Sequence, residues 1–268
     1  YKIMHICPRC ETPLAQSEVS GEYVDLTDMT VTTKFELADE PGTFVLAWTT
    51  TPWTLPGNTA LAVNKNLEYV KVKVADDESF YIVSKKLAEK VFAGKNIVES
   101  LDISISDYIG KKYTPPFNVF NNEEYLNKLE NSENIFKIWH ADFITDESGT
   151  GIAHEAPAFG AEDMELAKVN NIPVIKHVLM SGHFVSDVEK FVPELSGLAV
   201  KKKDDSISTD IEIVKWLAHN GKLFSKEKVV HSYPLCWRCK TPLLNYATSS
   251  WFVDVPKIKD QLISENQK

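Results

Sequence analysis

The chain has 268 residues, of which 43% are hydrophobic and 10% aromatic, and this suffices for one large domain or one domain with a small satellite. The formal net charge of −9 disfavours a protein that grips long nucleic acid across its surface, although a short single-stranded end remains compatible with it. Because no long apolar run and no basic segment leading into one occurs, we expect no membrane span and no secretory signal, and a cytoplasmic location.

Hydrophobic periodicity predicts a mixed set of strands and helices along the chain. Alternating or apolar runs predict four strands, at Thr43–Trp48, Tyr69–Val74, Phe80–Ser84 and Val229–Ser232. Helical spacing predicts four helices, at Ser84–Phe92, Glu123–Leu129, Asp163–Val169 and Ile211–Leu217, the last with a capping box in Thr209 and Glu212 and a stop at Asn220–Gly221. The run Lys201–Lys203 is expected to be a solvated loop, with phosphate contact as the alternative. Since strands and helices do not alternate regularly, we predict an α+β fold, with a barrel as one form of its sheet.

All four cysteines lie in two matching Cys-x-x-Cys pairs near the two ends of the chain. Cys7-Pro-Arg-Cys10 and Cys236-Trp-Arg-Cys239 are each followed by one residue and then Thr-Pro-Leu. Two such tight turns, each with two thiolates, predict one shared tetrahedral site with four cysteine ligands, with zinc favoured over iron. Two unrelated reduced pairs, or a redox pair, remain the alternatives. A shared site would bring the chain ends together, and with Tyr1 in place of an initiator methionine we expect an insertion domain excised from a longer protein.

The segment Trp48–Asn58 is rich in threonine and interrupted by two prolines. These prolines exclude a helix interior, and Gly57–Asn58 predicts a turn. The hydroxyls of this segment can donate and accept hydrogen bonds to a polar ligand and belong to Thr49, Thr50, Thr51 and Thr54. The structural alternative is an ordinary threonine-rich strand edge.

The segment Gly149–Asp163 predicts a strand, a proline-containing loop and a helix that begins near Ala161. Asp163 would then lie in the first helical turn, where the helix dipole favours the ionised carboxylate, and it could pair with an ammonium group. For Asp163 the alternative is an ordinary acid at a helix start, and for His154 it is a packed strand residue. No Ser–His–Asp set is evident, so a hydrolytic site here would use a positioned water.

Together these segments resemble the editing insertion of the isoleucyl-tRNA synthetases, which are class I aminoacyl-tRNA synthetases. Trp48–Asn58 is similar to the threonine-rich peptide of that family, and Pro52-Trp53-Thr54 favours the isoleucyl branch over the valyl and leucyl branches. Gly149–Asp163 is similar to the second half of the same site. Cys7–Leu14 and His231–Val253 are similar to the zinc-binding base of the insertion, and the resemblance is weakest across Leu101–Ile138.

The resemblance implies a function, a fold and partners. It implies hydrolysis of the ester bond of mischarged Val-tRNA(Ile), with isoleucine excluded by size and valyl-adenylate as a further substrate. The implied fold is a β-barrel-like editing domain with peripheral helices over residues 15–230. A small zinc-ribbon-like base would combine residues 1–14 and 231–268 around one structural zinc ion. The implied partners are the 3′ aminoacylated end of tRNA(Ile) and the remainder of the synthetase.

The family likeness also implies roles for single residues. Asp163, Thr51 and Thr54 would be catalytic, with Asp163 holding the substrate ammonium and the threonines orienting the ester and a water. His154 would form the wall that excludes the larger side chain. The residues expected to bind substrate are Trp48, Thr49, Thr50, Thr51, Asn58, His154 and Asp163.

Some positions depart from the family pattern, and alternatives remain open. Glu155 stands where relatives often carry an uncharged residue, and Glu162 replaces a frequent aspartate. The His-Ile-Gly-His and Lys-Met-Ser-Lys-Ser signatures of aminoacylation are absent, so we expect no charging of tRNA. An editing domain of the valyl or leucyl type, or a zinc-stapled module that binds the tRNA acceptor end without hydrolysis, are the alternative functions.

Overall fold

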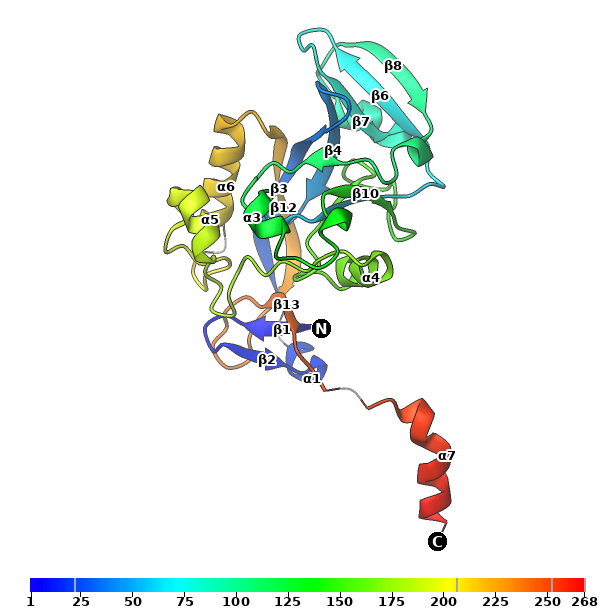
Figure 1. Cartoon of the computed structure of the whole chain (residues 1–268). Coiled ribbons are helices and arrows are strands. Elements are labelled where there is room, and N and C mark those ends of the chain that lie inside the picture. The colour runs from blue at the N-terminus through cyan, green and yellow to red at the C-terminus, as the bar shows by residue number, and fades with distance from the viewer. Residues whose placement is uncertain (22, 206, 252, 268) are drawn as a thin grey trace.

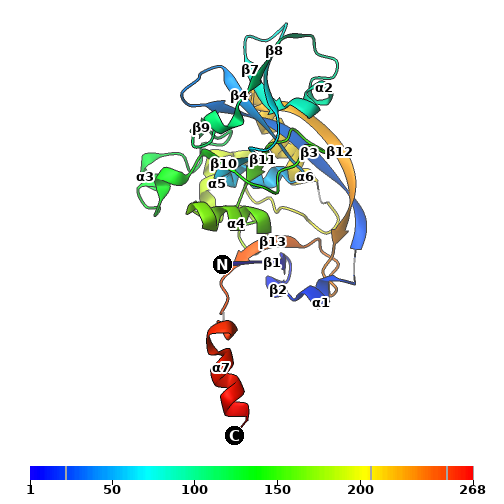
Figure 2. The ribbon, with the colours of Figure 1, turned by 90° about the vertical axis from the view of Figure 1, so that its right-hand side faces the viewer.

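A computed structural model of the chain describes residues 1–21, 23–205, 207–251 and 253–267. Figures 1 and 2 show a body built on a curled sheet, a small base below it and a terminal helix that extends away from both. The strands are β1 (Lys2–Cys7), β2 (Thr12–Leu14), β3 (Tyr23–Leu37), β4 (Thr43–Thr49), β5 (Ala60–Val63), β6 (Tyr69–Val74), β7 (Phe80–Ser84), β8 (Ile97–Ile103), β9 (Tyr113–Thr114), β10 (Lys137–His140), β11 (Ala153–Glu155), β12 (Leu223–Pro234) and β13 (Leu244–Thr248).

The helices of the body are short and lie around its sheet, as Figure 1 shows for α5 and α6 on one side and α4 on the other, whereas α1 lies in the base and α7 extends away. The α-helices are α1 (Gln16–Val19), α2 (Ala88–Val91), α3 (Glu123–Leu126), α4 (Ala161–Asn170), α5 (Ser186–Phe191), α6 (Ser208–His219) and α7 (Val255–Asn266). The 3-10 turns are η1 (Pro52–Gly57), η2 (Lys85–Leu87), η3 (Ile105–Asp107), η4 (Ser132–Asn134) and η5 (Pro193–Leu195). This mixed architecture, with its curled half-barrel sheet, confirms the predicted α+β fold.

Strand β4 is the centre of the body sheet, which has ten strands among the described residues. One edge of β4 pairs along its length with β3, and the other edge pairs in parallel with β7 at its start and with β11 at Trp48. One edge of β4 is thus shared by β7 and β11, and the sheet curls around this strand. The curl brings the end of β4 beside β11, and these two elements carry the two predicted halves of the site.

The base is a separate three-stranded sheet in the order β13-β1-β2, made from the two ends of the chain. Its own small core contains Cys7, Leu14, Val19, Cys236 and Leu243. The long antiparallel pair β3 and β12 runs from this base into the body, with Tyr23 opposite Pro234 and Thr33 opposite Leu223 (Figure 2). β12 therefore crosses the predicted boundary at residues 230/231 without interruption, and the division into three parts stays a prediction.

The short strands are the elements that the sequence predicted best. β6 and β7 have the predicted bounds, and β4 ends one residue later than expected. The helix predicted at Ser84–Phe92 is instead the turn η2 followed by α2, because Ser84 is buried at the end of β7 and its backbone N–H donates to the carbonyl of Thr150. The helix predicted from Glu123 ends at Leu126, and the strand predicted at Val229–Ser232 is only part of β12.

Helix α6 begins differently from the predicted capping box. Thr209 already lies inside the helix and donates its hydroxyl to the carbonyl of Ala199, while Glu212 pairs with Lys215. The carboxylate of Asp205 caps the helix by accepting from the backbone N–H of Ser208. The predicted stop is present, since Asn220 is the C-cap and Gly221 has a φ of 67°.

The expected solvated loop at Lys201–Lys203 is wrong for its first residue. The side chain of Lys201 is fully buried and its ammonium pairs with Asp28 and lies 3.5 Å from the carboxylate of Asp210. Asp28 also pairs with His231 at 2.7 Å. Lys201 thus joins β3, β12 and α6, whereas Lys203 is exposed.

Along the described residues, every helix is too short or too polar to serve as a membrane span.

Candidate active site and metal centre

The threonine-rich segment leaves β4 and forms the turn η1, which is buried from Pro52 to Gly57. The carbonyl of Trp53 accepts from Nε2 of His177 at 3.0 Å, and its backbone N–H donates to Asp210 at 3.2 Å. A Cβ on Gly57 would lie 1.8 Å from the His177 ring, so only glycine allows this approach. Burial lowers the pKa of His177 to about 4, so it acts as a neutral hydrogen-bond donor to the turn.

The second segment places β11 beside β4 and β5 and then turns into α4. Gly149 has a φ of 71° and lies against the indole of Trp48, so the chain reverses there at little conformational cost. Asp163 lies in the first turn of α4, as predicted, and its Oδ2 accepts from the backbone N–H of Ala156 at 2.7 Å. Burial raises the pKa of Asp163, and the Ala156 N–H partly offsets this rise by favouring the carboxylate.

His154 joins the two segments through hydrogen bonds on both ring nitrogens. Nδ1 lies 2.8 Å from the amide nitrogen of Asn58, and Nε2 lies 2.9 Å from the hydroxyl of Thr54. The Asn58 amide orientation is fixed because its nitrogen also donates to the carbonyl of Ala60 and its oxygen accepts from Tyr113 at 2.6 Å. Nδ1 of His154 must therefore accept, so the proton is on Nε2 and is donated to Thr54.

Burial lowers the pKa of His154 to about 3, with a smaller contribution from His177. His154 is therefore neutral near pH 7 and does not exchange a proton there. The hydroxyl of Thr54 donates to the carbonyl of Thr51 at 2.7 Å, so its proton is also committed. Thr51 is half-buried and its hydroxyl has only 3.4 Å contacts, to Thr49 and Thr54, so it remains available to a ligand, and it lines a cavity of about 220 Å³.

Two neighbouring cavities divide the predicted site residues. A cavity of about 390 Å³ is lined by Trp48, His154, Asp163 and the Gly149–Ala153 backbone. A smaller cavity of about 220 Å³ is lined by Thr51 and Thr54. His154 stands between the two groups, because it lines the first cavity and bonds to Thr54 in the second. Thr49 is buried, Thr50 is half-buried, and Asn58 is buried as the support of His154.

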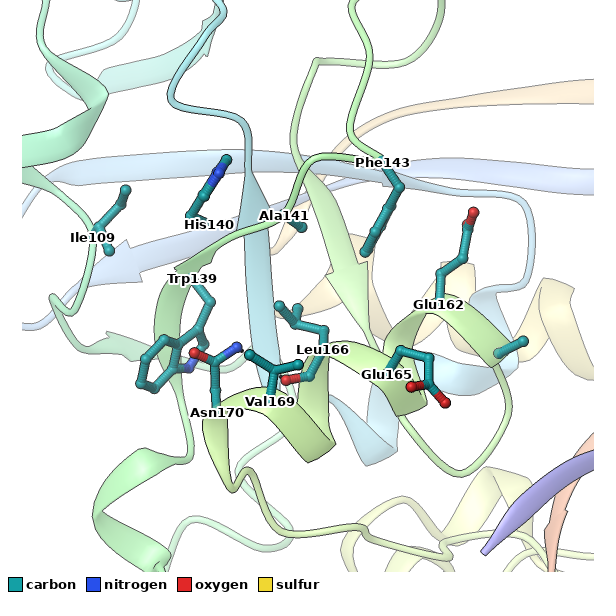
Figure 3. A pocket seen from close by; sticks show the side chains of 11 residues that line it. Ile109, Trp139, His140, Ala141, Phe143, Glu162, Glu165, Leu166, Val169 and Asn170 are labelled. Atoms are coloured by element: carbon teal, nitrogen blue, oxygen red, sulfur yellow. Dashed lines mark hydrogen bonds between the residues drawn. The ribbon is translucent and has the colours of Figure 1, made fainter. Parts of the chain in front are cut away.

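A third, larger cavity of about 640 Å³ adjoins the first and is mostly apolar. Figure 3 shows it between α4, which contributes Leu166 and Val169, and the β10 segment with Trp139. It shares Phe143 and Glu162 with the first cavity, so these two side chains lie between the two cavities.

Sequence reasoning missed Tyr113, Asp210 and His177 as supports of the site. Tyr113 lies in the weakly patterned segment Leu101–Ile138, and a single tyrosine there gives no signal until β9 pairs with β3 and brings it to Asn58. The burial of Glu155 in the cavity wall was also not foreseen, although its position beside the site was.

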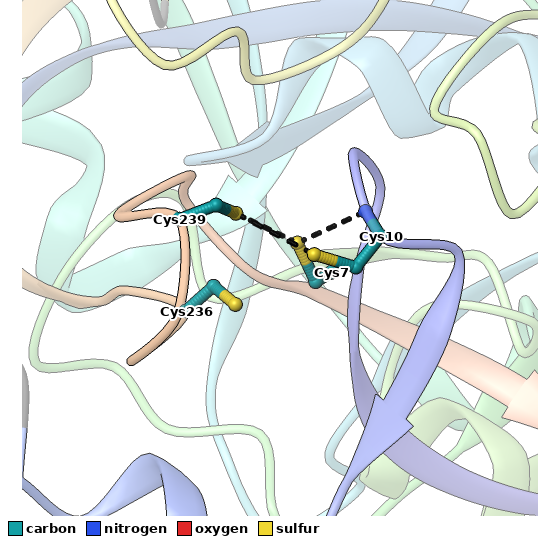
Figure 4. Close-up of side chains that lie close together, drawn as sticks. All are labelled: Cys7, Cys10, Cys236 and Cys239. Carbon is teal, nitrogen blue, oxygen red and sulfur yellow. Dashed lines mark hydrogen bonds between the residues drawn. The ribbon is translucent and has the colours of Figure 1, made fainter.

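The four cysteines converge in the base, as Figure 4 shows. Their sulfurs all lie within 4.8 Å of one another, with Cys7 and Cys239 at 3.3 Å and Cys10 and Cys239 at 3.7 Å. A tetrahedral ion with metal–sulfur bonds of about 2.3 Å requires sulfur separations of about 3.8 Å. The donor set therefore fits one tetrahedral metal ion, and the four cysteines are free thiols.

Comparison with known proteins agrees with the family suggested by the motifs. No family model matches the chain. It is similar to the isoleucine–tRNA ligases of Clostridium tetani, 38% identical over 268 residues, and Clostridium acetobutylicum, 40% identical over 269 residues. In both cases the match covers 100% of this chain and 24% of the relative, so the chain spans about a quarter of the length of these curated relatives.

A eukaryotic relative shows the same relation. The probable cytoplasmic isoleucine–tRNA ligase of Dictyostelium discoideum is 35% identical over 277 residues, which are 100% of this chain and 25% of that protein. Among solved structures, the editing domain of the P. falciparum cytosolic leucyl-tRNA synthetase aligns with a TM-score of 0.39 and 13% identity, over 54% of this chain and 67% of that chain.

Proposed function

We propose that this chain, which matches isoleucine–tRNA ligases along all of its own length, is the domain that removes valine from mischarged tRNA(Ile) in the cytoplasm. The observation that carries the proposal is the 390 Å³ cavity, which is lined by both the carboxylate of Asp163 at a helix start and the neutral ring of His154. Isoleucine exceeds valine by one methylene. In an apolar pocket this difference gives only about 1–3 kcal/mol of discrimination, and these two amino acids are the standard example of this limit. A second, smaller pocket that hydrolyses the wrong product removes this limit.

The substrate offers an α-ammonium, a small apolar side chain, an ester and a ribose. Asp163 binds the ammonium, because an ionised carboxylate at a helix start is its natural partner. His154 forms the wall that excludes isoleucine, and its place is set by Asn58 and Thr54. The hydroxyl of Thr51 orients a water molecule, which attacks the ester carbonyl. The carbon–oxygen bond to the ribose then breaks, and the ribose oxygen takes the proton.

The proposed partners are the 3′ aminoacylated end of tRNA(Ile), with valyl-adenylate as a second substrate, and the remainder of the synthetase. The acidic net charge suits a short end better than a long duplex. We also propose that Cys7, Cys10, Cys236 and Cys239 hold one structural zinc ion, which closes the base and takes no part in hydrolysis.

Single-turnover deacylation of Val-tRNA(Ile) and Ile-tRNA(Ile) tests the proposal. We expect the valyl ester to be hydrolysed about tenfold faster or more. Asp163→Ala should lower the rate on Val-tRNA(Ile) about 30-fold or more, because the buried ammonium loses its partner. Glu165→Ala is the matched control, since Glu165 is an exposed acid on the same helix that pairs with Lys168.

Other outcomes of the same assay would replace the proposal. An unchanged rate in Asp163→Ala would remove that residue from the mechanism. Faster discharge of Thr-charged or Ile-charged tRNA would indicate an editing domain of the valyl or leucyl type. Binding of mischarged tRNA without turnover would indicate a binding module that lacks hydrolytic activity.

A further inference from the structure

Glu155 is a buried carboxyl group in the wall of the candidate pocket. It is the last residue of β11, its side chain is 2% exposed, and it lines the same 390 Å³ cavity as Asp163. Its carbonyl accepts from the backbone N–H of Thr59, which fixes the main chain. Its Oε2 is fully buried and has no hydrogen-bond partner. A buried carboxyl oxygen without a partner in a cavity wall is the kind of group that a ligand satisfies.

The surroundings of Glu155 favour its neutral form. The peptide nitrogen that follows it, on Ala156, donates to Asp163, so the two carboxyl groups are neighbours. The titratable groups whose charges act on Glu155 or feel its charge are Asp163 and Glu162 on α4 and Tyr113 on β9, while the adjacent His154 points to the other face of β11. Burial raises the pKa of Glu155 well above its ordinary value, and the charges of Asp163 and Glu162 raise it further.

We propose that Glu155 is a substrate-binding residue that acts as a neutral carboxylic acid and donates a hydrogen bond to an ester or ribose oxygen of the bound aminoacyl-adenosine end. The inference rests on the proposed function of the pocket. A neutral carboxyl is a donor as well as an acceptor, whereas the substrate ammonium is a donor only. We therefore assign Asp163 as the acceptor of hydrogen bonds from the ammonium, and Glu155 as the donor of a hydrogen bond to an oxygen.

Charge balance supports this division of roles. In the cavity wall the ionised carboxylate of Asp163 matches the single positive charge of the α-ammonium, while the charge of the exposed Glu162 is screened by water. A second buried carboxylate at Glu155 would leave an unmatched charge in a site screened from water, which is costly. A buried carboxylic acid that stays neutral also adds a donor where negative charge develops on the ester oxygen during hydrolysis.

Two substitutions at this position separate the donor role from a charge role. Glu155→Gln keeps the shape and a donor but cannot ionise, and we expect its single-turnover rate on Val-tRNA(Ile) to stay within about threefold of wild type at neutral pH. Glu155→Met keeps the volume without a donor and should lose about tenfold or more. Equal losses in both variants would overturn the proposal in favour of a carboxylate. An unimpaired Met variant would overturn any contact with substrate.

The protonation state has a direct spectroscopic test that does not depend on turnover. The infrared difference between wild type and Glu155→Gln should contain the carbonyl stretch of a protonated carboxylic acid at neutral pH. This band should shift when an adenosine carrying valine in a non-hydrolysable amide linkage is added. Its absence, or its insensitivity to the analogue, would overturn the proposal.

The pH profile adds a control on the sign of the effect. Because the pKa of Glu155 is raised, its donor is present at lower pH and is lost as pH rises through that pKa. The ratio of the Gln variant rate to the wild-type rate should therefore stay level or rise toward alkaline pH, and a ratio that falls as pH rises contradicts the proposal. A wild-type chain that leaves Val-tRNA(Ile) intact would instead defeat the proposed function, whatever the infrared band shows.

Discussion

His154 works as a fixed neutral surface because every polar atom of its ring is used. The amide of Asn58 holds Nδ1, and the Nε2 proton is given to Thr54. With its pKa lowered to about 3, the ring cannot take a proton from a water near pH 7. The hydroxyl of Thr54 is committed as well, whereas that of the half-buried Thr51 stays available to a water or an ester. At the scale of single residues, the site favours orientation and electrostatics over general base catalysis.

Tyr113→Phe tests whether this orientation depends on the whole hydrogen-bond chain. Without the phenol donor, the oxygen of Asn58 loses its buried partner, and the amide no longer holds the His154 tautomer firmly. We expect kcat for Val-tRNA(Ile) to fall about three- to tenfold with KM little changed, and a loss of stability of about 1 kcal/mol. ¹⁵N shifts of the His154 ring should show a mixture of tautomers in the variant and the Nε2–H form alone in wild type.

The matched control is Tyr125→Phe, which makes the same chemical change on α3, where the ring packs on Phe120. It should leave both the His154 spectrum and kcat unchanged. A Tyr113→Phe chain that loses stability but keeps the wild-type tautomer and kcat would reduce Tyr113 to a structural role.

At the scale of elements, the turn η1 is held from outside by two buried groups. Asp210 on α6 accepts from the backbone N–H of Trp53, and His177 donates to its carbonyl. Lys201 in turn lies between Asp210 and Asp28, so α6, β3 and the threonine-rich segment share one buried charge cluster. Burial raises the pKa of Asp210 to about 7, although the nearby Lys201 opposes this rise.

Lys201→Met tests the role of this cluster in stability. Removing the ammonium takes the buried counter-charge from Asp28 and Asp210, which keep only His231 and the Trp53 N–H, and should cost about 3–5 kcal/mol in the free energy of unfolding by urea. Lys203→Met, two residues away in the same lysine run but exposed, should change it by about 0.5 kcal/mol or less. Adding Asp210→Asn to Lys201→Met should recover part of the loss. Equal effects of the two lysine substitutions would show that the buried pair adds no stability.

Local patterns predicted the short strands whose apolar residues alternate, as in β6, or form one continuous apolar run, as in β7. β6 and β7 were found with their bounds, and the start of α4 at Ala161 placed Asp163 correctly in its first turn. β3 escaped prediction because its threonines and acids mask the alternation, and its order comes from pairing with β12 far along the chain. The burial of Lys201 was missed for the same reason, because its partner Asp28 is far away in the sequence and no neighbouring residue indicates the pair. For the site, the sequence identified Thr54, Asn58 and His154, but only the folded chain shows their hydrogen bonds to one another.

At the scale of the whole molecule, the body and the base are joined by the β3–β12 ribbon and by the chain ends. β1, β2 and β13 bring residues from both ends into one sheet, whose β1 and β13 also pack against the body through Ile6, Leu244 and Tyr246, while the part around the cysteines has a small core of its own. Such a small core buries too little apolar surface to be stable alone, and the proposed metal ion would cross-link the two cysteine turns and supply what the core lacks. The two Cys-x-x-Cys turns thus fix the geometry from which the ribbon enters the body.

Metal removal should therefore melt the base while the body stays folded. Metal analysis should give one zinc ion per chain, and a Cys7→Ser or Cys239→Ser variant should lose it, because each provides one of the four converging sulfurs. After chelation, hydrogen exchange should accelerate in β2 and in the two Cys-x-x-Cys turns by about 100-fold or more, since the opening free energy of this part of the base falls by several kcal/mol. The same measurement on β4 and β5, which belong to the body core, is the internal control and should change little. Two metal ions per chain, or a base that keeps its protection from exchange without metal, would contradict a single shared site. Loss of protection throughout the body would show that the two parts do not unfold independently.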